Sequence, residues 1–336
     1  MKQLKMEGGE SLEHEASPLR RWGFLEIIDG TFQVFRTRFV PLFFSVFLLI
    51  GLFQFVFNLL NLQLSETLEP LSDPFLDPMP ADASLEPFGW GEAVLMALMT
   101  GGVLVTYIFL YPLMRVAVSW ITVRNLIEEQ AVTTGEALKR AWKTATSALL
   151  THWLAGAIVL GGLVVIAALV FLPFSLLGII AGEWVVTLIL SGIVFLLLIL
   201  PLLLWVLIRL SLLFPVIVEE QTSYFAALKR SWSLTRRSFW RLFAFFLFVG
   251  TILFGVTGIM GVVLQLLLMW WASIDWTYLW IGNIIVALVL TGLTCLLEAG
   301  LGVLATVLYV DQRIRLEGVD LELAFRISAG KEDGRV

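Results

Sequence analysis

Long apolar stretches alternate with short polar ones along the whole chain. The stretch "VVTLILSGIVFLLLILPLLLWVLI" is typical, because it contains no charged residue and is as long as the roughly 20 residues that a helix needs to cross a bilayer. The pattern therefore predicts an all-α integral membrane protein. Its six transmembrane helices are expected at residues 39–62, 93–123, 148–172, 184–218, 239–268 and 279–310.

The composition supports this fold class. Hydrophobic residues make up 59% of the 336 residues and charged residues only 15%, whereas a soluble domain has about a quarter of its residues charged. The predicted spans use up most of the length, which excludes a large soluble domain. The single cysteine, Cys295, lies in an apolar run and is expected to be a small core residue.

Basic residues are segregated to one side of the predicted membrane. No Lys or Arg occurs in residues 39–114, 144–208 or 242–312, and the loops inside these ranges are acidic or neutral. Cytoplasmic loops carry the excess of Lys and Arg in membrane proteins. We therefore expect both termini and every basic cluster to be cytoplasmic, and the acidic loop 63–92 to lie outside.

One basic stretch occurs three times. "LKRSWSLTRRSFWRLF" (228–243) aligns without gaps with "IDGTFQVFRTRFVPLF" (28–43) and resembles "EEQAVTTGEALKRAWKTATSALLTHW" (128–153). The even-numbered spans end similarly, in "RNLIEEQ", "PVIVEEQ" and "LYVDQR". The chain thus divides into three pseudo-repeats of a basic interfacial helix, a span out and a span back: a tail at 1–21, repeats at 22–130, 131–221 and 222–316, and a tail at 317–336.

The repeated stretch has the pattern of a basic amphipathic helix. In 225–243, Phe225, Leu228 and Trp232 fall on one arc and most of the bases fall on the other, while Thr133 and Glu136 form a capping-box signal in the second copy. Such helices lie at the headgroup level and attract anionic lipid, a nearer partner than nucleic acid for bases attached to spans. The predicted lipid contacts are Arg36, Arg38, Lys139, Arg140, Lys143, Lys229, Arg230, Arg236, Arg237 and Arg241.

Three charges interrupt the even-numbered spans. Arg115, Arg209 and Glu298 each lie about ten to fifteen residues before the cytoplasmic end of a span, so similar depths are expected at a rise of about 1.5 Å per residue. A charge inside a span is expected to face the protein and to be paired. One interpretation is a salt-bridged cluster that joins the three repeats. The other is a site for a substrate anion or a proton, and the first is preferred because one acid with two bases neutralises well.

No set of catalytic, metal-binding or cofactor-binding residues is apparent. The loop 63–92 carries Asp73, Asp77 and Asp82, but it lacks the glycine and terminal glutamate of a calcium-binding EF-hand, so a solvated acidic loop is preferred. His152 follows the second basic helix and is expected to be an interfacial residue. No nucleophile elbow, phosphate-binding loop or dinucleotide fingerprint occurs.

The stretches "ALKRSWSLTRRSFWRLF" and "LYVDQRIRLEGVDLELAF", together with "FLEIIDGTFQVFRTRF", resemble the membrane domain of glycerophosphoryl diester phosphodiesterases. That family consists of bacterial polytopic membrane proteins, many of which stand alone without a catalytic domain. The resemblance implies the bacterial cytoplasmic membrane and lipid or envelope physiology. It does not imply phosphodiesterase activity here, since the catalytic barrel needs a His/Glu metal site and the chain has only His14 and His152.

Two functions are consistent with these features. The first is a non-enzymatic scaffold or accessory component of an envelope or lipid-related assembly, with anionic lipid and another membrane protein as its candidate partners. The alternative is a transporter or lipid-translocating protein that uses Arg115, Arg209 and Glu298. The first is preferred because the spans carry few other polar residues: Gln54, Asn58, Gln265 and Asn283.

Overall fold

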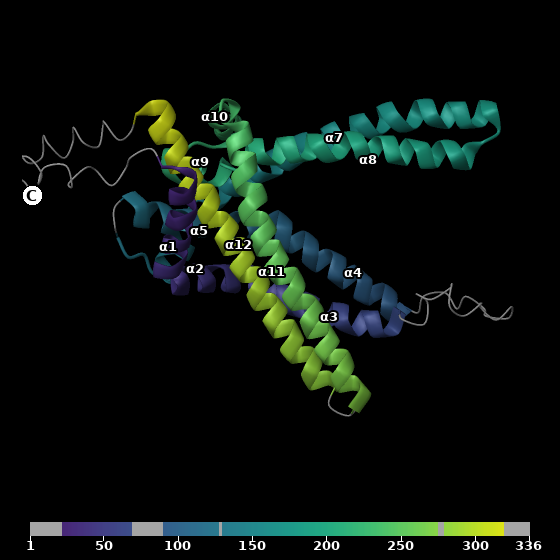
Figure 1. Cartoon of the computed structure of the whole chain (residues 1–336), viewed down its shortest axis with the longest axis horizontal. Helices are drawn as coiled ribbons and strands as arrows, with labels where there is room; N and C mark the ends of the chain where they lie inside the picture. Colours follow the sequence, from purple (N-terminus) through teal and green to yellow (C-terminus); the bar gives the residue numbers. More distant parts are fainter. Residues whose placement is uncertain (1–21, 69–89, 128–129, 275–278, 319–336) are drawn as a thin grey trace, which may run out of the picture.

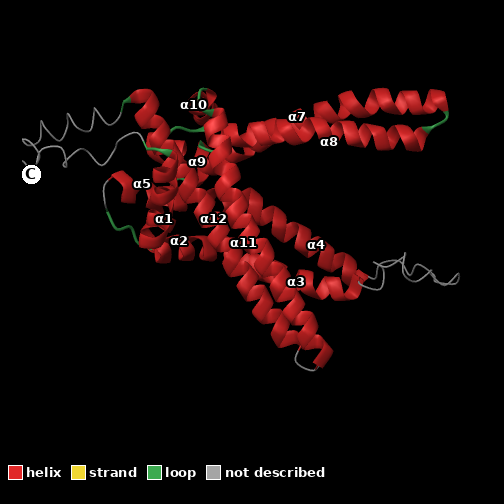
Figure 2. Cartoon of the chain, in the orientation of Figure 1, coloured by secondary structure: helices red, strands yellow, loops and turns green. Residues whose placement is uncertain are grey.

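The computed structural model describes residues 22–68, 90–127, 130–274 and 279–318, which form helices and short connections (Figures 1 and 2). Two of the elements, η1 and η3, are π-helical. In chain order the elements are α1 (Phe24–Thr37), α2 (Phe39–Val46), η1 (Phe47–Gly51), α3 (Leu52–Leu68), α4 (Trp90–Val105), η3 (Thr106–Leu110), α5 (Tyr111–Ile127), α6 (Thr134–Lys143), α7 (Ala145–Ala181), α8 (Trp184–Leu210), α9 (Leu213–Glu220), α10 (Tyr224–Arg236), α11 (Phe239–Ile274) and α12 (Leu279–Glu317).

The six predicted spans are confirmed within the described part of the chain. By length and composition, helices able to cross a membrane cover Phe39–Asn61, Ala93–Ile127, Ala145–Ile180, Trp184–Glu220, Phe239–Trp271 and Trp280–Glu317. The even-numbered helical segments continue four, two and seven residues past their predicted ends, because their polar final turns stay helical. The tails 1–21 and 319–336, and most of the acidic loop 63–92, lie outside the described residues.

The helices form three hairpins that diverge from a common base (Figure 1). α3 packs beside α4, α7 beside α8, and α11 beside α12. At the base, α1, α2, α5, α6, α9 and α10 pack with the start of α11 and the C-terminal part of α12 around one apolar core. We call this base the hub. The described α7–α8 connection lies at the tip of its hairpin and belongs to a segment predicted to be external, whereas the basic helices α1, α6 and α10 are all in the hub.

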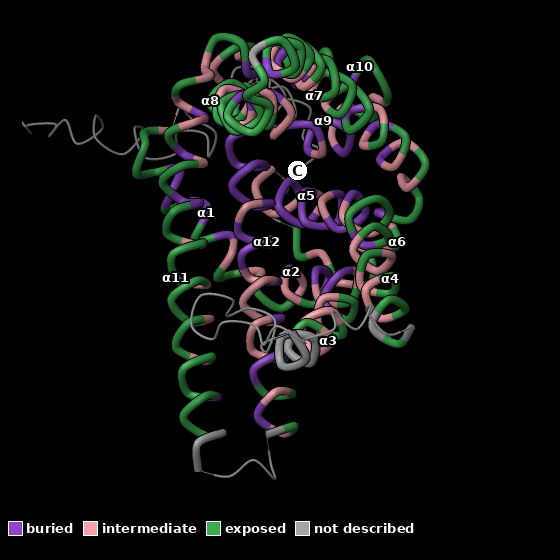
Figure 3. Tube along the Cα trace, turned by 90° about the vertical axis from the view of Figure 1, so that its right-hand side faces the viewer, coloured by how far each residue is buried: buried purple, intermediate pink, exposed green. Residues whose placement is uncertain are grey.

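Helix α12 is the central element of the hub. It contacts helices from each predicted repeat, namely α1, α2, α3, α5, α9, α10 and α11. Every residue from 302 to 312 is buried, as the purple stretch of α12 in Figure 3 shows. This burial includes polar residues, among them Thr306, Asp311 and Gln312. The C-terminal part of this span is therefore surrounded by protein. A helix that faced lipid there would have an exposed side.

Each basic helix is separated from the span that follows it. α1 ends at Thr37 and α2 begins at Phe39, α6 ends one residue before α7, and Arg237 and Ser238 separate α10 from α11. The expectation that 225–243 runs as one helix into its span is therefore wrong. The backbone leaves helical geometry at Arg38 (φ −116°, ψ 27°) and at Thr144 (φ −97°, ψ 4°), which allows each short helix to pack on the hub at its own angle.

The predicted capping box begins α6. The backbone N–H of Thr133 donates to Glu136 Oε2 (2.9 Å), and the N–H of Glu136 donates to Thr133 Oγ1 (3.3 Å). These bonds satisfy two of the free N–H groups at the start of the helix. The hydrogen bond from the Thr133 backbone also holds the pKa of the exposed Glu136 carboxyl below its usual range. The start of α6, between the second and third spans, is thus determined by two residues that are three positions apart in the sequence.

Two departures from regular helix occur in the first hairpin. The π-helical turn η3 ends at Leu110, two residues before Pro112. In a regular α-helix the ring of a proline clashes with the carbonyl group four residues earlier and leaves that carbonyl without an N–H partner, which the π-helical turn relieves. The π-helical turn η1 ends at Gly51, where an added Cβ would lie 2.7 Å from the Phe47 ring and 3.1 Å from Cys295 Sγ. Gly51 therefore permits the close approach of the first and last spans. Cys295 is buried there, as predicted for a core residue.

Candidate functional site

Arg115 and Glu298 form an ion pair between α5 and α12. Arg115 Nη2 lies 3.0 Å from Glu298 Oε2, and Arg115 Nε donates to the Tyr111 hydroxyl at 2.8 Å. The two charged side chains are 13% and 17% exposed. Gly302 makes the contact possible, since an added Cβ would lie 2.6 Å from Val118 on α5. The pair joins the first and third predicted repeats at a point where an unpaired charge is costly.

Arg115 also lines a cavity of about 580 Å³ between α5, α7, α8, α9, α11 and α12. The rest of its wall is largely apolar, and its polar lining residues are Tyr111, Arg115, Ser119, His152 and Ser211. The His152 ring lies 5.9 Å from the ring of Tyr111 and 6.0 Å from that of Phe214, measured between centroids. A mostly apolar cavity with a few convergent polar groups is the usual form of a small-molecule site.

Arg209 does not join this pair, so the predicted three-residue cluster is corrected to Arg115 and Glu298. The Arg209 guanidinium lies over the rings of Trp205 (5.3 Å), Trp232 (5.2 Å) and Phe239 (5.7 Å), measured from Cζ to the ring centroids. Similar depth along a span was not enough for contact, because Arg209 projects toward α10 and α11 whereas Arg115 projects toward α12.

A second charged network fixes the beginning of α1 to α12. Asp311 is fully buried and accepts hydrogen bonds from Arg241 Nη1 (2.7 Å), Arg315 Nε (2.9 Å) and the backbone N–H of Trp22 (3.2 Å). The Trp22 carbonyl accepts in turn from Arg241 Nη2 (3.0 Å) and from Arg315. One buried carboxylate therefore holds residues that are 70 and 289 positions away in the chain.

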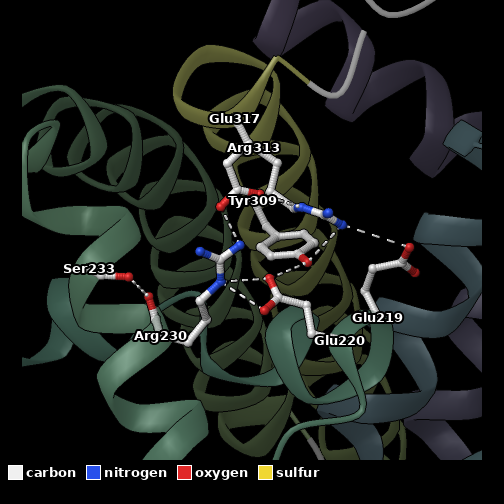
Figure 4. A network of polar contacts seen from close by, with 7 residues as sticks. All are labelled: Glu219, Glu220, Arg230, Ser233, Tyr309, Arg313 and Glu317. Carbon is white, nitrogen blue, oxygen red and sulfur yellow. Dashed lines mark hydrogen bonds and ion pairs between the residues drawn. The ribbon is translucent and has the colours of Figure 1, made fainter. Parts of the chain in front are cut away.

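A third network, shown in Figure 4, joins α9, α10 and α12. Arg230 Nε lies 2.7 Å from Glu220 Oε2, and its Nη2 pairs with Glu317. The Tyr309 hydroxyl donates to Glu220 at 3.1 Å, and Arg313 Nε lies 3.1 Å from Glu317. Burial lowers the pKa of Arg230, but its hydrogen bonds with the two carboxylates outweigh that effect and raise the pKa above its usual value.

Arg230 and Arg241 of these two networks were predicted as lipid contacts, but Glu220, Tyr309 and Asp311 were not among the predicted site residues. Glu220 belongs to the repeat ending "PVIVEEQ", and Tyr309 and Asp311 belong to "LYVDQR". The similarity of these endings predicted duplication, not contact. Polar residues recurring at the ends of three spans were the available signal that the ends meet.

The ten bases predicted to contact lipid divide into two groups. Four of them contact the protein: Arg38 Nε donates to Asn125 (2.6 Å), Arg140 lies over Trp120 (4.6 Å from Cζ to the ring centroid), and Arg230 and Arg241 belong to the networks above. The other six are exposed, and no ion pair to them is formed within the described residues: Arg36, Lys139, Lys143, Lys229, Arg236 and Arg237. Their contact with lipid stays a prediction.

Metal binding finds no support in the described residues, which contain no group of three or more His, Cys, Asp or Glu side chains able to hold an ion. The acidic loop residues Asp73, Asp77 and Asp82 lie outside the described residues.

A family model, the membrane domain of glycerophosphoryl diester phosphodiesterase, matches residues 182–322, so the predicted resemblance to this family is confirmed over that part of the chain. The match covers α8 to α12 and includes Arg209, Glu298, Glu220 and Asp311, whereas Trp22 lies outside it. It concerns the membrane domain and not the catalytic domain of that family. No curated protein and no solved structure matches the chain.

Proposed function

We propose that this chain is a non-enzymatic scaffold or accessory component of a bacterial envelope or lipid-related assembly, and that it engages anionic lipid from the cytoplasmic side. The observation that carries the proposal is the division of the bases in the hub. Four bases contact protein groups, while six remain exposed on or beside the short helices that precede the spans. Exposed bases at the end of a span are positioned for anionic headgroups.

The arrangement of the hub also supports three pseudo-repeats. Each begins with a short helix that a break separates from the following span. The first and third share a further detail, because the rings of Phe39 and Phe43 stack with centroids 5.6 Å apart and those of the aligned Phe239 and Phe243 stack at 6.2 Å. In this proposal the three short helices are interfacial, and the hub is where duplicated units meet.

Lipid retention tests the proposed function. We expect that replacing Lys229 and Arg237 with Gln lowers the amount of co-purifying phosphatidylglycerol or cardiolipin, because each base near an anionic surface contributes about 1 kcal/mol before salt screening. Lys229→Arg with Arg237→Lys is the matched control, since it keeps the charge at both positions and should keep the lipid. Native mass spectrometry measures both variants. Unchanged lipid in the Gln variant would contradict the proposal.

The proposed orientation places the hub and both termini in the cytoplasm and the hairpin tips outside. Single cysteines introduced at Glu183, at the tip of the α7–α8 hairpin, and at Gln221, between α9 and α10, test it in a Cys295→Ala background. A membrane-impermeant thiol reagent applied to intact cells should label only position 183. Labelling at position 221 would reverse the orientation.

The cavity beside Arg115 favours a second candidate, a transporter or lipid-translocating protein. Gly156 lines the cavity, and an added Cβ there meets nothing within 4 Å, so Gly156→Leu should fill the cavity without a clash. Gly161→Leu is the matched control, because Gly161 lies on the same helix, also has free space, and does not line the cavity. Loss of fluorescent-lipid exchange in proteoliposomes with only the first variant would support this candidate. Exchange that equals the protein-free background in the wild type would exclude it.

A further inference from the structure

Arg209 is a buried cation that has no carboxylate partner in the described part of the chain. The residue is only 8% exposed, and its Nε and Nη1 atoms are enclosed with no hydrogen-bond acceptor among the described residues. Three aromatic rings, of Trp205, Trp232 and Phe239, surround the guanidinium. Aromatic faces attract the charge, but they cannot accept its N–H groups in the directions in which a guanidinium donates.

The contrast with Arg115 shows what Arg209 lacks. Arg115 is similarly enclosed, yet it has a carboxylate 3.0 Å away in Glu298 and a hydroxyl acceptor in Tyr111. Arg236 follows Trp232 by four residues on α10, so it lies on the same face of that helix as the ring that covers Arg209, and it is a second, exposed cation. Two guanidiniums on one side of the hub, with no carboxylate paired to either among the described residues, repel each other. An anion between them would remove the repulsion and would give the unmet N–H groups of Arg209 an acceptor.

The surroundings of Arg209 indicate where such an anion would come from. Arg209 is in the last turn of α8, at the cytoplasmic end of its span in the proposed orientation. Trp240 lies beside the aromatic rings, 5.3 Å from Phe239 between centroids, and is 77% exposed at the start of the apolar surface of α11. An exposed tryptophan and a base at the end of a span mark the headgroup level of a bilayer.

We infer that Arg209 and Arg236 form a binding site for a phosphate group, with Trp205, Trp232 and Phe239 as its walls. Guanidinium groups bind phosphate through paired hydrogen bonds, which a point charge such as Lys does not reproduce. This inference rests on the proposed function in one respect: one of the two sources of the phosphate is the headgroup of an anionic lipid. Free phosphate or a soluble phosphate ester from the cytoplasm is the other source.

The thermal stability of three proteins tests the site. Wild type, Arg209→Met and Arg209→Lys are each reconstituted in nanodiscs of phosphatidylcholine or of phosphatidylglycerol, whose phosphate is not shielded by a choline cation. The wild type should melt about 5 °C higher in phosphatidylglycerol if the site is well saturated. Arg209→Met should lose most of this rise, and Arg209→Lys should keep only part of it.

A second arm separates the two sources of phosphate. Inorganic phosphate is added to the phosphatidylcholine nanodiscs, with chloride at matched ionic strength as the control. A wild-type rise in Tm with phosphate, absent in Arg209→Met, assigns the site to free phosphate. A rise only in phosphatidylglycerol assigns it to a lipid headgroup. If Arg209→Met keeps the wild-type response in both arms, or if the wild type responds in neither, the inference is overturned.

The direction in which Arg209→Met changes the Tm in phosphatidylcholine nanodiscs, without added phosphate, distinguishes a binding site from a structural role. Removing a buried cation that has no anion should leave Arg209→Met as stable as the wild type or more stable there. If Arg209 serves only to hold the three rings together, the variant should melt lower in every lipid by the same amount.

Lys139→Gln with Lys143→Gln, distant in sequence and on α6, tests the exposed bases separately. Loss of lipid in that variant with no effect of Arg209 would leave the proposed function intact and refute only this site.

Discussion

Helix α12 and the α7–α8 hairpin are both apolar enough to span a bilayer, yet their surroundings differ. Residues 302–312 of α12 are all buried by other helices, whereas most residues of α7 beyond Gly156 are exposed, and the most extensive packing of α7 is along α8. The mean hydropathy of the most apolar window is 2.3 for the last span and 2.9 for the span containing α7. Apolar character alone therefore does not distinguish a helix packed in protein from one that needs lipid.

The difference between these regions is in their polar residues. α12 carries Asp311, Gln312 and Thr306 in its buried part, and such groups are tolerated inside a membrane protein when partners are provided. The described part of α7 beyond its first turns has no charged residue. The hub is thus held by specific polar contacts, and the hairpin depends on the bilayer around it. Three sets of variants test this contrast.

The largest effect is expected at Asp311. Asp311→Asn keeps the size of the side chain but leaves Arg241 and Arg315 without their anion, and loss of one partner of a buried ion pair typically costs about 3–5 kcal/mol. The variant should express poorly or melt early in detergent. Asp29→Asn, at an exposed position of α1, is the control and should change the free energy of unfolding by less than about 0.5 kcal/mol. Equal melting of the two variants would refute the central role of this network.

A somewhat smaller effect is expected at Glu298, whose side chain is 17% exposed. Glu298→Gln leaves Arg115 unpaired and should destabilise the protein by about 3 kcal/mol, and Arg115→Met with Glu298→Met should recover much of the loss. Thermal unfolding of the purified single and double variants measures this. A stable Glu298→Gln protein would instead mean that water or substrate solvates the pair, as a transport path requires.

The smallest effects come from a matched pair of leucines. Leu304→Ala in α12 removes a side chain with 0% exposure and should cost about 2 kcal/mol through lost packing. Leu197 in α8 is 69% exposed, so detergent surrounds position 197 in the wild type and in Leu197→Ala alike. This substitution should therefore lower the free energy of unfolding by less than about 0.5 kcal/mol. If the two substitutions are equally costly, the α7–α8 hairpin is packed against a partner that the isolated chain lacks, such as a second copy.

The sequence predicted the spans well because hydropathy and the absence of bases are local properties. It also predicted the α6 capping box, which involves residues only three positions apart. It did not predict the partners of the buried charges, since position along a span gives depth but not the direction in which a side chain projects. Arg115 and Arg209 therefore looked equivalent, although one meets Glu298 and the other meets aromatic rings. Asp311 was missed because its partners come from Trp22 and Arg241, and no local pattern connects them.

The central place of α12 also sets the order of events during synthesis. Among the described helices it is synthesised after all the others, and it supplies partners of Trp22, Arg115 and Glu220. Before α12 is inserted, Glu220 can already pair with Arg230 and Arg115 can already bond to Tyr111, but Trp22 lacks Asp311 and Arg115 lacks its carboxylate. Insertion of α12 is therefore the step that completes the polar contacts of the hub.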